Sequence, residues 1–140
     1  MKFLFGLLLL NSVLFGFKSD FMHDYNKALE LAKSQKKDVY LLVTSEDCKW
    51  CRKFEKVTLS DEETMKMLKE KFILLVLNRD KDVIPDHIKA KRVPKHFFLD
   101  SNGELIYSIL GYWNPEDFAS FVVEVDKIKQ EDKYETSTNK

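Results

Sequence analysis

Two short, continuous apolar runs constrain the fold of this 140-residue chain more than any other feature. They lie at residues 39–43 (VYLLV) and 72–77 (FILLVL) and are rich in residues that favour strands. Runs of this kind, without polar alternation, are typical of strands buried on both faces, so we expect them to be central and parallel. The segment between them predicts two helices, one over residues 48–59 and one that a Ser60–Glu63 capping box opens. A strand, two helices and a second strand indicate an α/β fold.

Helical and hairpin signals complete the predicted set of elements. Over residues 20–36, Phe21, Tyr25, Ala28 and Ala32 recur at the spacing of an amphipathic helix. The Asn102-Gly103 dipeptide suits the tight turn of an antiparallel hairpin. The remaining predicted elements are a short helix over residues 86–91, strands over 96–100 and 104–110, and a C-terminal helix that starts at Asn114-Pro115.

The two ends of the chain differ from its body. One cation, Lys2, precedes an apolar stretch over residues 3–17. As a helix this stretch reaches roughly 22 Å, which is short of the roughly 30 Å of a bilayer core. Residues 1–18 therefore predict a signal peptide, with an uncleaved anchor or a buried helix as the alternative. We expect residues 19–130 to form one domain and residues 131–140, which lack an apolar period, to form a disordered tail.

Charge and glycine content exclude two large classes of function. Lys and Arg total 23 and Asp and Glu total 23, so no basic excess exists to follow a nucleic-acid backbone. Two of the four glycines lie in the N-terminal apolar stretch, which leaves too few for a Gly-rich phosphate loop. We expect no nucleic-acid partner and no cofactor.

The chemistry is expected at Cys48-Lys49-Trp50-Cys51, which follows the first apolar run at the start of a predicted helix. Unpaired N–H groups and aligned peptide dipoles at a helix N-terminus favour an anion, so Cys48 is the candidate nucleophile, with a thiol pKa expected well below about 8.5. Cys51 lies one turn deeper, where it can attack a mixed disulfide on Cys48. Lys49 and Arg52 are candidate supports for the thiolate, with a solvated helix surface as the alternative.

Other functions of a cysteine pair fit this sequence less well. A haem-attachment motif needs a histidine directly after the second cysteine, where this chain has Arg52. A zinc site needs four ligands, and the three histidines are scattered singly, so we expect no metal. A structural disulfide between Cys48 and Cys51 would close a very short loop and stabilise the fold little. Redox chemistry is the favoured interpretation.

Residues 39–121 resemble the thioredoxin-like superfamily, in particular its exported thiol-disulfide interchange members. The run CKWCRKFEKVTLSDEETMKMLKEKF, which starts at Cys48, is similar to the C-terminal domain of the DsbD interchange proteins and to the thioredoxin-7 family. Arg92-Val93-Pro94 matches the family's cis-proline loop. The resemblance implies a central mixed sheet of four to five strands flanked by helices.

The resemblance also implies which residues meet the substrate. Pro94 would lie beside the cysteines, and Val93, Pro94 and Trp50 would contact the substrate, with the Val93 backbone exposed for pairing. A trans proline at a strand entry is the alternative. Two positions depart from the family's pattern: Asp47 replaces a tryptophan and Leu42 replaces a buried acid. These departures leave open which group handles the proton of Cys51.

The function that the resemblance implies is enzymatic. We expect a thiol-disulfide oxidoreductase with a redox-active Cys48–Cys51 disulfide, acting on the thiols or disulfides of proteins in the periplasm or as a secreted protein. A partner protein would recycle the pair, and the direction would be reductive. No stable membrane span is expected after removal of the signal peptide. The alternative is a thioredoxin-like module that binds client proteins with little turnover.

Overall fold

The structure, a computed structural model, describes residues 20–138. The predicted signal peptide lies outside these residues. The elements are, in chain order, α1 (Tyr25–Gln35), β1 (Asp38–Thr44), α2 (Lys49–Val57), α3 (Glu62–Lys71), β2 (Phe72–Asn78), the short 3₁₀ helix η2 (Asp86–Ile88), β3 (Lys95–Leu99), β4 (Leu105–Leu110) and α4 (Pro115–Thr138). The α/β fold expected from the sequence, with a central sheet flanked by helices, is confirmed, and the sheet has four strands.

The four strands form one mixed sheet in the order β2-β1-β3-β4. β1 runs parallel to β2 and antiparallel to β3, with Leu42 opposite His96, and β3 pairs antiparallel with β4. The predicted parallel pair is confirmed, but β2 is an edge strand rather than a central one. Met22 covers part of this edge, donating its N–H to Leu74 at 2.8 Å and accepting the Val76 N–H at 3.0 Å.

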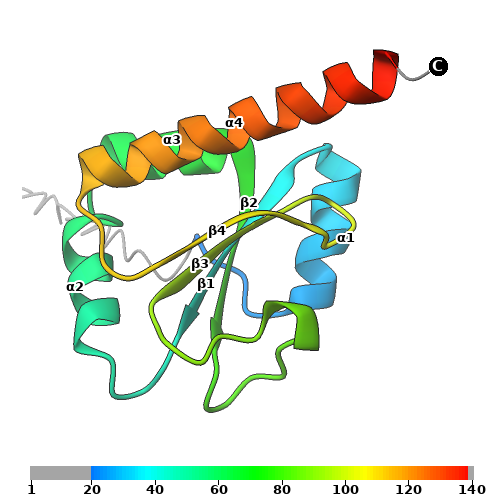
Figure 1. Cartoon of the computed structure of the whole chain (residues 1–140). Helices are drawn as coiled ribbons and strands as arrows, with labels where there is room; N and C mark the ends of the chain where they lie inside the picture. The colour runs from blue at the N-terminus through cyan, green and yellow to red at the C-terminus, as the bar shows by residue number, and fades with distance from the viewer. Residues whose placement is uncertain (1–19, 139–140) are drawn as a thin grey trace, which may run out of the picture.

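Helices cover both faces of the sheet, and Figure 1 shows α2 and α1 on opposite sides of the strands. We call the face that packs against α2, α3 and α4 the α2 face, and the face that packs against α1 and η2 the α1 face. Successive strand side chains point to opposite faces. Tyr40 and Leu42 of β1 accordingly belong to the α2 face, and Val39, Leu41 and Val43 to the α1 face. Burial on both sides explains the continuous apolar run.

The first helix begins later than the sequence predicts. Asp24 caps α1 by accepting a backbone N–H from the first turn at 3.0 Å. Phe21 therefore does not share a helical stripe with Ala28 and Ala32, which pack on the α1 face. It packs on the α2 face, edge-on to the Tyr40 ring with the centroids 6.3 Å apart. The aspartate cap sets the start of the helix, although the apolar spacing begins before it.

Asp61 caps α3, so the expected capping box at Ser60 is wrong. The Asp61 carboxylate accepts the Thr64 N–H at 2.8 Å and the Thr64 hydroxyl at 2.7 Å. The Ser60 hydroxyl instead donates back to carbonyls in the last turn of α2, including Val57 at 3.3 Å. Because that hydroxyl is engaged with α2, the next residue takes the capping position.

The hairpin between β3 and β4 turns at the predicted dipeptide. Gly103 has a φ of +87°, in the region that favours glycine, whereas Asn102 has a negative φ. The Asp100 carboxylate accepts the N–H groups of Asn102 at 2.8 Å and Glu104 at 3.0 Å. One glycine and one aspartate therefore hold this turn.

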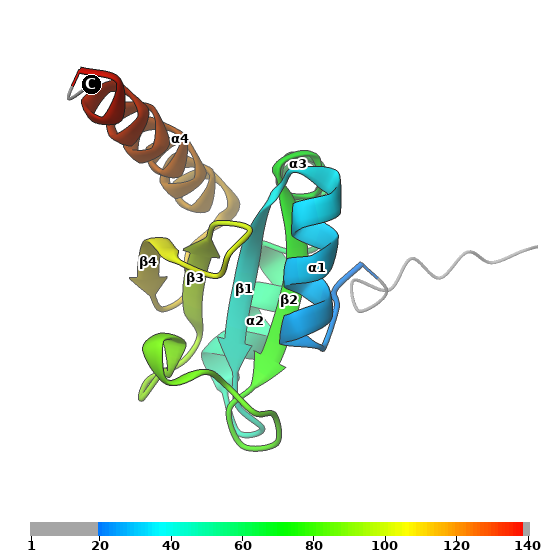
Figure 2. The ribbon, with the colours of Figure 1, turned by 90° about the vertical axis from the view of Figure 1, so that its right-hand side faces the viewer.

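The C-terminal helix is longer than the sequence indicates. Phe118, Val122 and Val125 of α4 are buried on the α2 face. Residues 131–138, expected to be disordered, continue α4 as an exposed helix that projects beyond the sheet in Figure 2. An extension from a packed helix avoids the nucleation cost, so its polar residues can remain helical. No helix within residues 20–138 is both long and apolar enough to cross a bilayer.

Candidate functional site

Cys48 and Cys51 lie together at the start of α2 and form a disulfide, with an S–S distance of 2.10 Å and a Cα–Cα distance of 5.2 Å. Cys48 is the N-cap residue of α2, and its sulfur accepts the Cys51 N–H at 3.1 Å. Cys48 is 8 % exposed, whereas Cys51 is fully buried. Cys48 is therefore the sulfur that an approaching molecule meets first.

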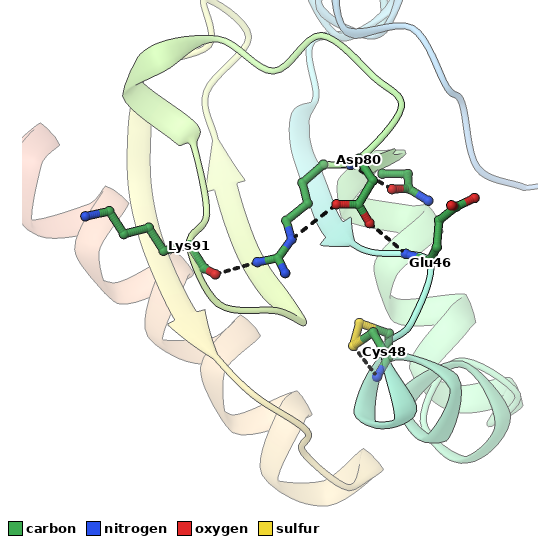
Figure 3. A network of polar contacts seen from close by, with 7 residues as sticks. Glu46, Cys48, Asp80 and Lys91 are labelled. Atoms are coloured by element: carbon green, nitrogen blue, oxygen red, sulfur yellow. Dashed lines mark hydrogen bonds and ion pairs between the residues drawn. A yellow bond between two sulfur atoms is a disulfide. The ribbon is translucent and has the colours of Figure 1, made fainter.

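The loop before the cysteine pair is tied to a loop that is distant in the sequence (Figure 3). The Glu46 N–H donates to the Asp80 carboxylate at 3.0 Å, and Arg79 Nε lies 3.8 Å from the same carboxylate. The Arg79 guanidinium also donates to the carbonyl of Lys91. We call these contacts the Arg79–Asp80 link. They join the segment before the first cysteine to the segment between β2 and β3.

An open groove of about 330 Å³ lies at the start of α2 and is lined by Trp50, Val93, Pro94, Gly111 and Tyr112. The Val93–Pro94 peptide bond is cis, and the Pro94 carbonyl accepts the Gly111 N–H at 2.8 Å. The backbone N–H and carbonyl of Val93 have no hydrogen-bond partner within residues 20–138. The three residues expected to contact substrate therefore line one groove.

The two cations next to the cysteines contact other groups. Lys49 Nζ lies 5.9 Å from the centroid of the Trp50 ring, and the Arg52 guanidinium pairs with Glu55 at 3.3 Å. Within the described part of the chain, neither cation forms a hydrogen bond with a cysteine sulfur. Any support they give a thiolate acts through their charge rather than through contact.

A buried chain of hydrogen bonds, which sequence reasoning missed, crosses the α2 face from Tyr40 through His96 to Gly111. The Tyr40 hydroxyl lies 2.8 Å from His96 Nδ1, and His96 Nε2 lies 2.8 Å from the Gly111 carbonyl. A carbonyl only accepts, so Nε2 carries the proton and Nδ1 accepts the tyrosine hydroxyl. Phe54 of α2 meets the His96 ring edge-on, with the centroids 4.6 Å apart. His96 thus links α2, β1 and a residue of the groove.

Burial determines the protonation states of His96 and Tyr40. The pKa of His96 is lowered to about 4, mainly because the ring is removed from water and to a smaller extent because Lys95 is nearby, while the hydrogen bond to Gly111 opposes the shift. Burial also raises the pKa of Tyr40 well above its usual value. Both side chains are neutral at physiological pH. The only sequence signal for the pair was a histidine two residues after Pro94, and such a lone histidine in a strand indicates packing as readily as function.

A larger cavity of about 650 Å³ lies along α3, away from the cysteines. Leu59, Met65, Lys66 and Glu70 are among its lining residues. It contains no thiol and no buried titratable group, so its size does not mark it as the reactive site. Residues 20–138 hold no group of three or more His, Cys, Asp or Glu side chains placed to bind a metal ion.

The chain is similar to one curated human protein and to several solved structures. Human anterior gradient protein 3 is 30 % identical over 93 residues, which are 64 % of this chain and 54 % of that protein, so the chain spans about half the length of this relative. The oxidised C-terminal domain of Neisseria meningitidis DsbD has a TM-score of 0.60 at 19 % identity, over 74 % of this chain and 97 % of that one. A thioredoxin from Thermus thermophilus has a TM-score of 0.61 at 20 % identity, over 78 % and 87 %.

The family itself is shown by a match along most of the chain. Residues 25–126 match the model of the thioredoxin-like domain family. This range contains the whole sheet, the cysteine pair and the Val93–Pro94 loop. The protein therefore belongs to the thioredoxin-like domain family, and on this fold Cys48 and Cys51 lie at disulfide distance.

Proposed function

We propose that this protein is a thiol-disulfide oxidoreductase that reduces the disulfides of protein clients outside the cytoplasm. The observation that carries the proposal is the Cys48–Cys51 disulfide at the N-terminus of α2, next to a groove that contains Pro94. A pair of this kind, in which Cys48 is 8 % exposed and Cys51 is fully buried, suits an attacking thiol and a resolving thiol.

The start of α2 favours the reactive form of Cys48. The first N–H groups of a helix have no partner in the preceding turn, and their dipoles favour a negative charge. The Cys51 N–H already points at the Cys48 sulfur, at 3.1 Å. In the reduced protein the same N–H would donate to a thiolate at Cys48, which is the nucleophilic form. Lys49 and Arg52 add positive charge on this side of the helix.

The reaction proceeds in two displacements. The Cys48 thiolate attacks one sulfur of a client disulfide, so that a Cys48–client bond forms, the client bond breaks, and the second client sulfur leaves as a thiolate and takes a proton. Cys51 then attacks the Cys48 sulfur as a thiolate, which forms the Cys48–Cys51 disulfide and breaks the Cys48–client bond. The first client sulfur leaves as a thiolate and takes up a proton, which balances the proton that Cys51 has lost. The client gains two electrons and the protein loses two. A thiol partner protein must return these electrons for a second cycle.

The groove suits an extended client segment. The free N–H and carbonyl of Val93 offer the two backbone hydrogen bonds that an added strand needs. Trp50, 51 % exposed, offers an apolar surface beside them. Backbone pairing places a client sulfur without requiring one particular sequence, which suits an enzyme with several protein clients.

Two parts of the proposal rest on the sequence. The apolar stretch at residues 3–17 supports export, and the similarity of the run after Cys48 to the DsbD C-terminal domain supports the reductive direction. Dithiol pairs of this kind span reduction potentials from about −270 to about −120 mV, so the potential of the Cys48–Cys51 couple measures the direction. A value near the reducing end of that range is expected.

Replacement of Cys51 by alanine tests the mechanism. The Cys51→Ala variant, incubated with a disulfide-containing client protein, should accumulate a mixed disulfide through Cys48, visible as a band that a reductant removes from a non-reducing gel. The Cys48→Ala variant is the matched control and should trap nothing. A client-binding module with little turnover would instead retain the client non-covalently in both variants, and that result would contradict the proposal.

A further inference from the structure

We propose that the groove selects client segments that carry an acidic side chain next to the reacting cysteine, and that Lys53 on α2 is the residue that reads this charge. The inference rests on the proposed function, because it names the class of client that the Cys48 site takes. It is carried by two aromatic rings that line the groove and by two lysines that lie over these rings.

The two rings form one wall of the groove. Trp50 and Tyr112 both line it, and their ring centroids are 6.0 Å apart. Trp50 comes from α2, two residues after Cys48, whereas Tyr112 follows β4 next to Gly111. Trp50 is half exposed, so a client segment in the groove meets an aromatic surface close to the reacting sulfur.

Two ammonium groups lie over these rings. Lys53 Nζ is 4.5 Å from the centroid of the Tyr112 ring and 5.2 Å from that of Trp50, and Lys49 Nζ is 5.9 Å from the Trp50 centroid. Attraction between a cation and a ring face holds each lysine in place without neutralising it. An ammonium carries three N–H donors and no acceptor, so a lysine over a ring still has donors for a carboxylate.

The charges around the groove leave these lysines unpaired. Within residues 20–138, neither Lys49 nor Lys53 forms an ion pair, whereas the neighbouring Arg52 pairs with Glu55 at 3.3 Å. Glu46, in the loop before Cys48, pairs with Lys81 at 2.5 Å. Asp47 is the one other acid in that loop; it is exposed and has no ion pair in the described part of the chain.

The complementary client follows from these positions. A segment that lays an apolar side chain against Trp50 and Tyr112 and carries a carboxylate one or two residues from its cysteine satisfies both the rings and Lys53. A lysine at the same place meets two like charges. Such an exposed charge contact is expected to change the rate about 3- to 10-fold rather than to decide it absolutely.

The test uses two peptides that differ only in charge. Each has the form Ala-X-Phe-Cys-Ala-Ala with blocked ends, X being Glu in one and Lys in the other, and each is offered as its symmetrical disulfide to the reduced full-length protein. The measured quantity is the ratio of the second-order oxidation rates, Glu peptide over Lys peptide. Neutral hydroxyethyl disulfide serves as a reference oxidant for the cysteine pair itself.

Two charge-reversal variants on α2 distinguish an effect of the groove from an effect of the net charge of the protein. Lys53→Glu removes the proposed contact, while Lys56→Glu makes the same change in net charge one turn further along α2, at an exposed residue that lies over neither ring. We expect a ratio of about 3 to 10 for the wild type and for Lys56→Glu, and a ratio below 1 for Lys53→Glu. High salt should bring all ratios towards 1.

Two results would overturn the inference alone, and a third result would overturn the proposed function as well. A wild-type ratio near 1, with normal oxidation by hydroxyethyl disulfide, overturns the acidic preference and leaves the proposed function standing. Equal shifts in Lys53→Glu and Lys56→Glu also overturn it, because the selectivity then comes from net charge. If the reduced protein reacts with neither peptide nor with hydroxyethyl disulfide, the proposed function is wrong, and the inference, which rests on that function, is wrong too.

Discussion

The two faces of the sheet are packed with different kinds of side chain. The α1 face is mainly aliphatic, with Ala28 and Ala32 of α1 against the valines, leucines and isoleucines of the strands, and its few aromatic rings include Phe97. The α2 face carries a cluster of rings around Phe98 and Phe118, and within it a histidine hydrogen-bonded on both sides. Both faces are buried, and the hydrogen-bonded pair of Tyr40 and His96 lies on the α2 face.

The α1 face therefore mainly stabilises the fold, whereas the α2 face also positions the elements of the functional site. An aliphatic core gains free energy from area and close packing, and many arrangements of similar volume serve equally well. Hydrogen bonds have directions, so a buried polar group fixes the elements that it joins. On the α2 face, the Tyr40–His96–Gly111 chain and the edge-on Phe54 ring join the helix of the cysteines to the wall of the groove. We expect substitutions on the two faces to act differently.

Phe54→Ala should have the largest effect. Phe54 is fully buried on α2, three residues after Cys51, and its ring meets those of His96 and Phe118. Loss of the ring should lower the free energy of unfolding by about 3–5 kcal/mol, measured by urea unfolding. The rate of disulfide reduction per folded molecule should fall as well, because the helix that presents the cysteines is less firmly held. An unchanged rate of disulfide reduction per folded molecule would contradict the claim that the α2 face positions the cysteines.

Leu75→Ala is the matched change on the α1 face. Leu75 of β2 is fully buried there and its removal leaves a cavity that costs about 2–5 kcal/mol. The rate of peptide-disulfide reduction, measured well below the unfolding transition, should equal that of the wild type. A reduced rate for this variant would show that the two faces do not divide the roles as we argue.

The pH dependence of stability tests the buried histidine. Unfolded histidine binds a proton near pH 6.5, whereas burial lowers the pKa of folded His96 to about 4. Between these values the unfolded chain binds more protons, so stability falls as the pH falls from 6.5 to 4, by about 3 kcal/mol in total. Above pH 6.5 this contribution is constant.

His96→Gln is the control for that measurement. A glutamine can donate to Gly111 and accept from Tyr40 but does not titrate. Carboxylates titrate in both proteins, so the difference between their urea-unfolding curves at pH 7, 5.5 and 4.5 isolates His96. Wild-type stability should fall more steeply; parallel curves would mean that His96 is not held neutral by burial.

Arg79→Gln should have the smallest effect on stability and still change the chemistry. The Arg79–Asp80 link is exposed, so its loss should cost less than about 1 kcal/mol. The link joins the loop before Cys48 to the chain that leads into Val93, so oxidation by peptide disulfides should slow while oxidation by hydroxyethyl disulfide does not. Lys89→Gln, which removes an exposed pair with Asp86 in the same segment, is the control. If both variants are oxidised by peptide disulfides at the same rate, the Arg79–Asp80 link does not support the reaction.

The sequence predicts the parts of this molecule that local patterns encode. Apolar runs gave the two parallel strands, Asn102-Gly103 the hairpin, and the Cys48–Cys51 spacing after a strand the reactive pair. The caps at Asp24 and Asp61 were missed or shifted by one residue, because several polar residues compete at each helix start and tertiary packing decides among them.

The rest of the site depends on contacts between distant residues. Tyr40 and His96 are 56 residues apart and meet only because β1 pairs with β3. Tyr112 reaches Trp50 and Lys53 only after β4 has returned alongside β3. Neither meeting leaves a periodic signal in a single sequence, so the support of the cysteines and the charge of the groove emerge from the structure alone.

The most direct test of the account is the reactivity of the two thiols in the reduced protein. Brief alkylation with iodoacetamide at neutral pH, followed by mass spectrometry of the peptides, gives a separate rate for Cys48 and for Cys51. We expect Cys48, the N-cap of α2 and 8 % exposed, to be alkylated rapidly and Cys51, fully buried, to react far more slowly. An inert Cys48, or a Cys51 that reacts first, would contradict the central claim.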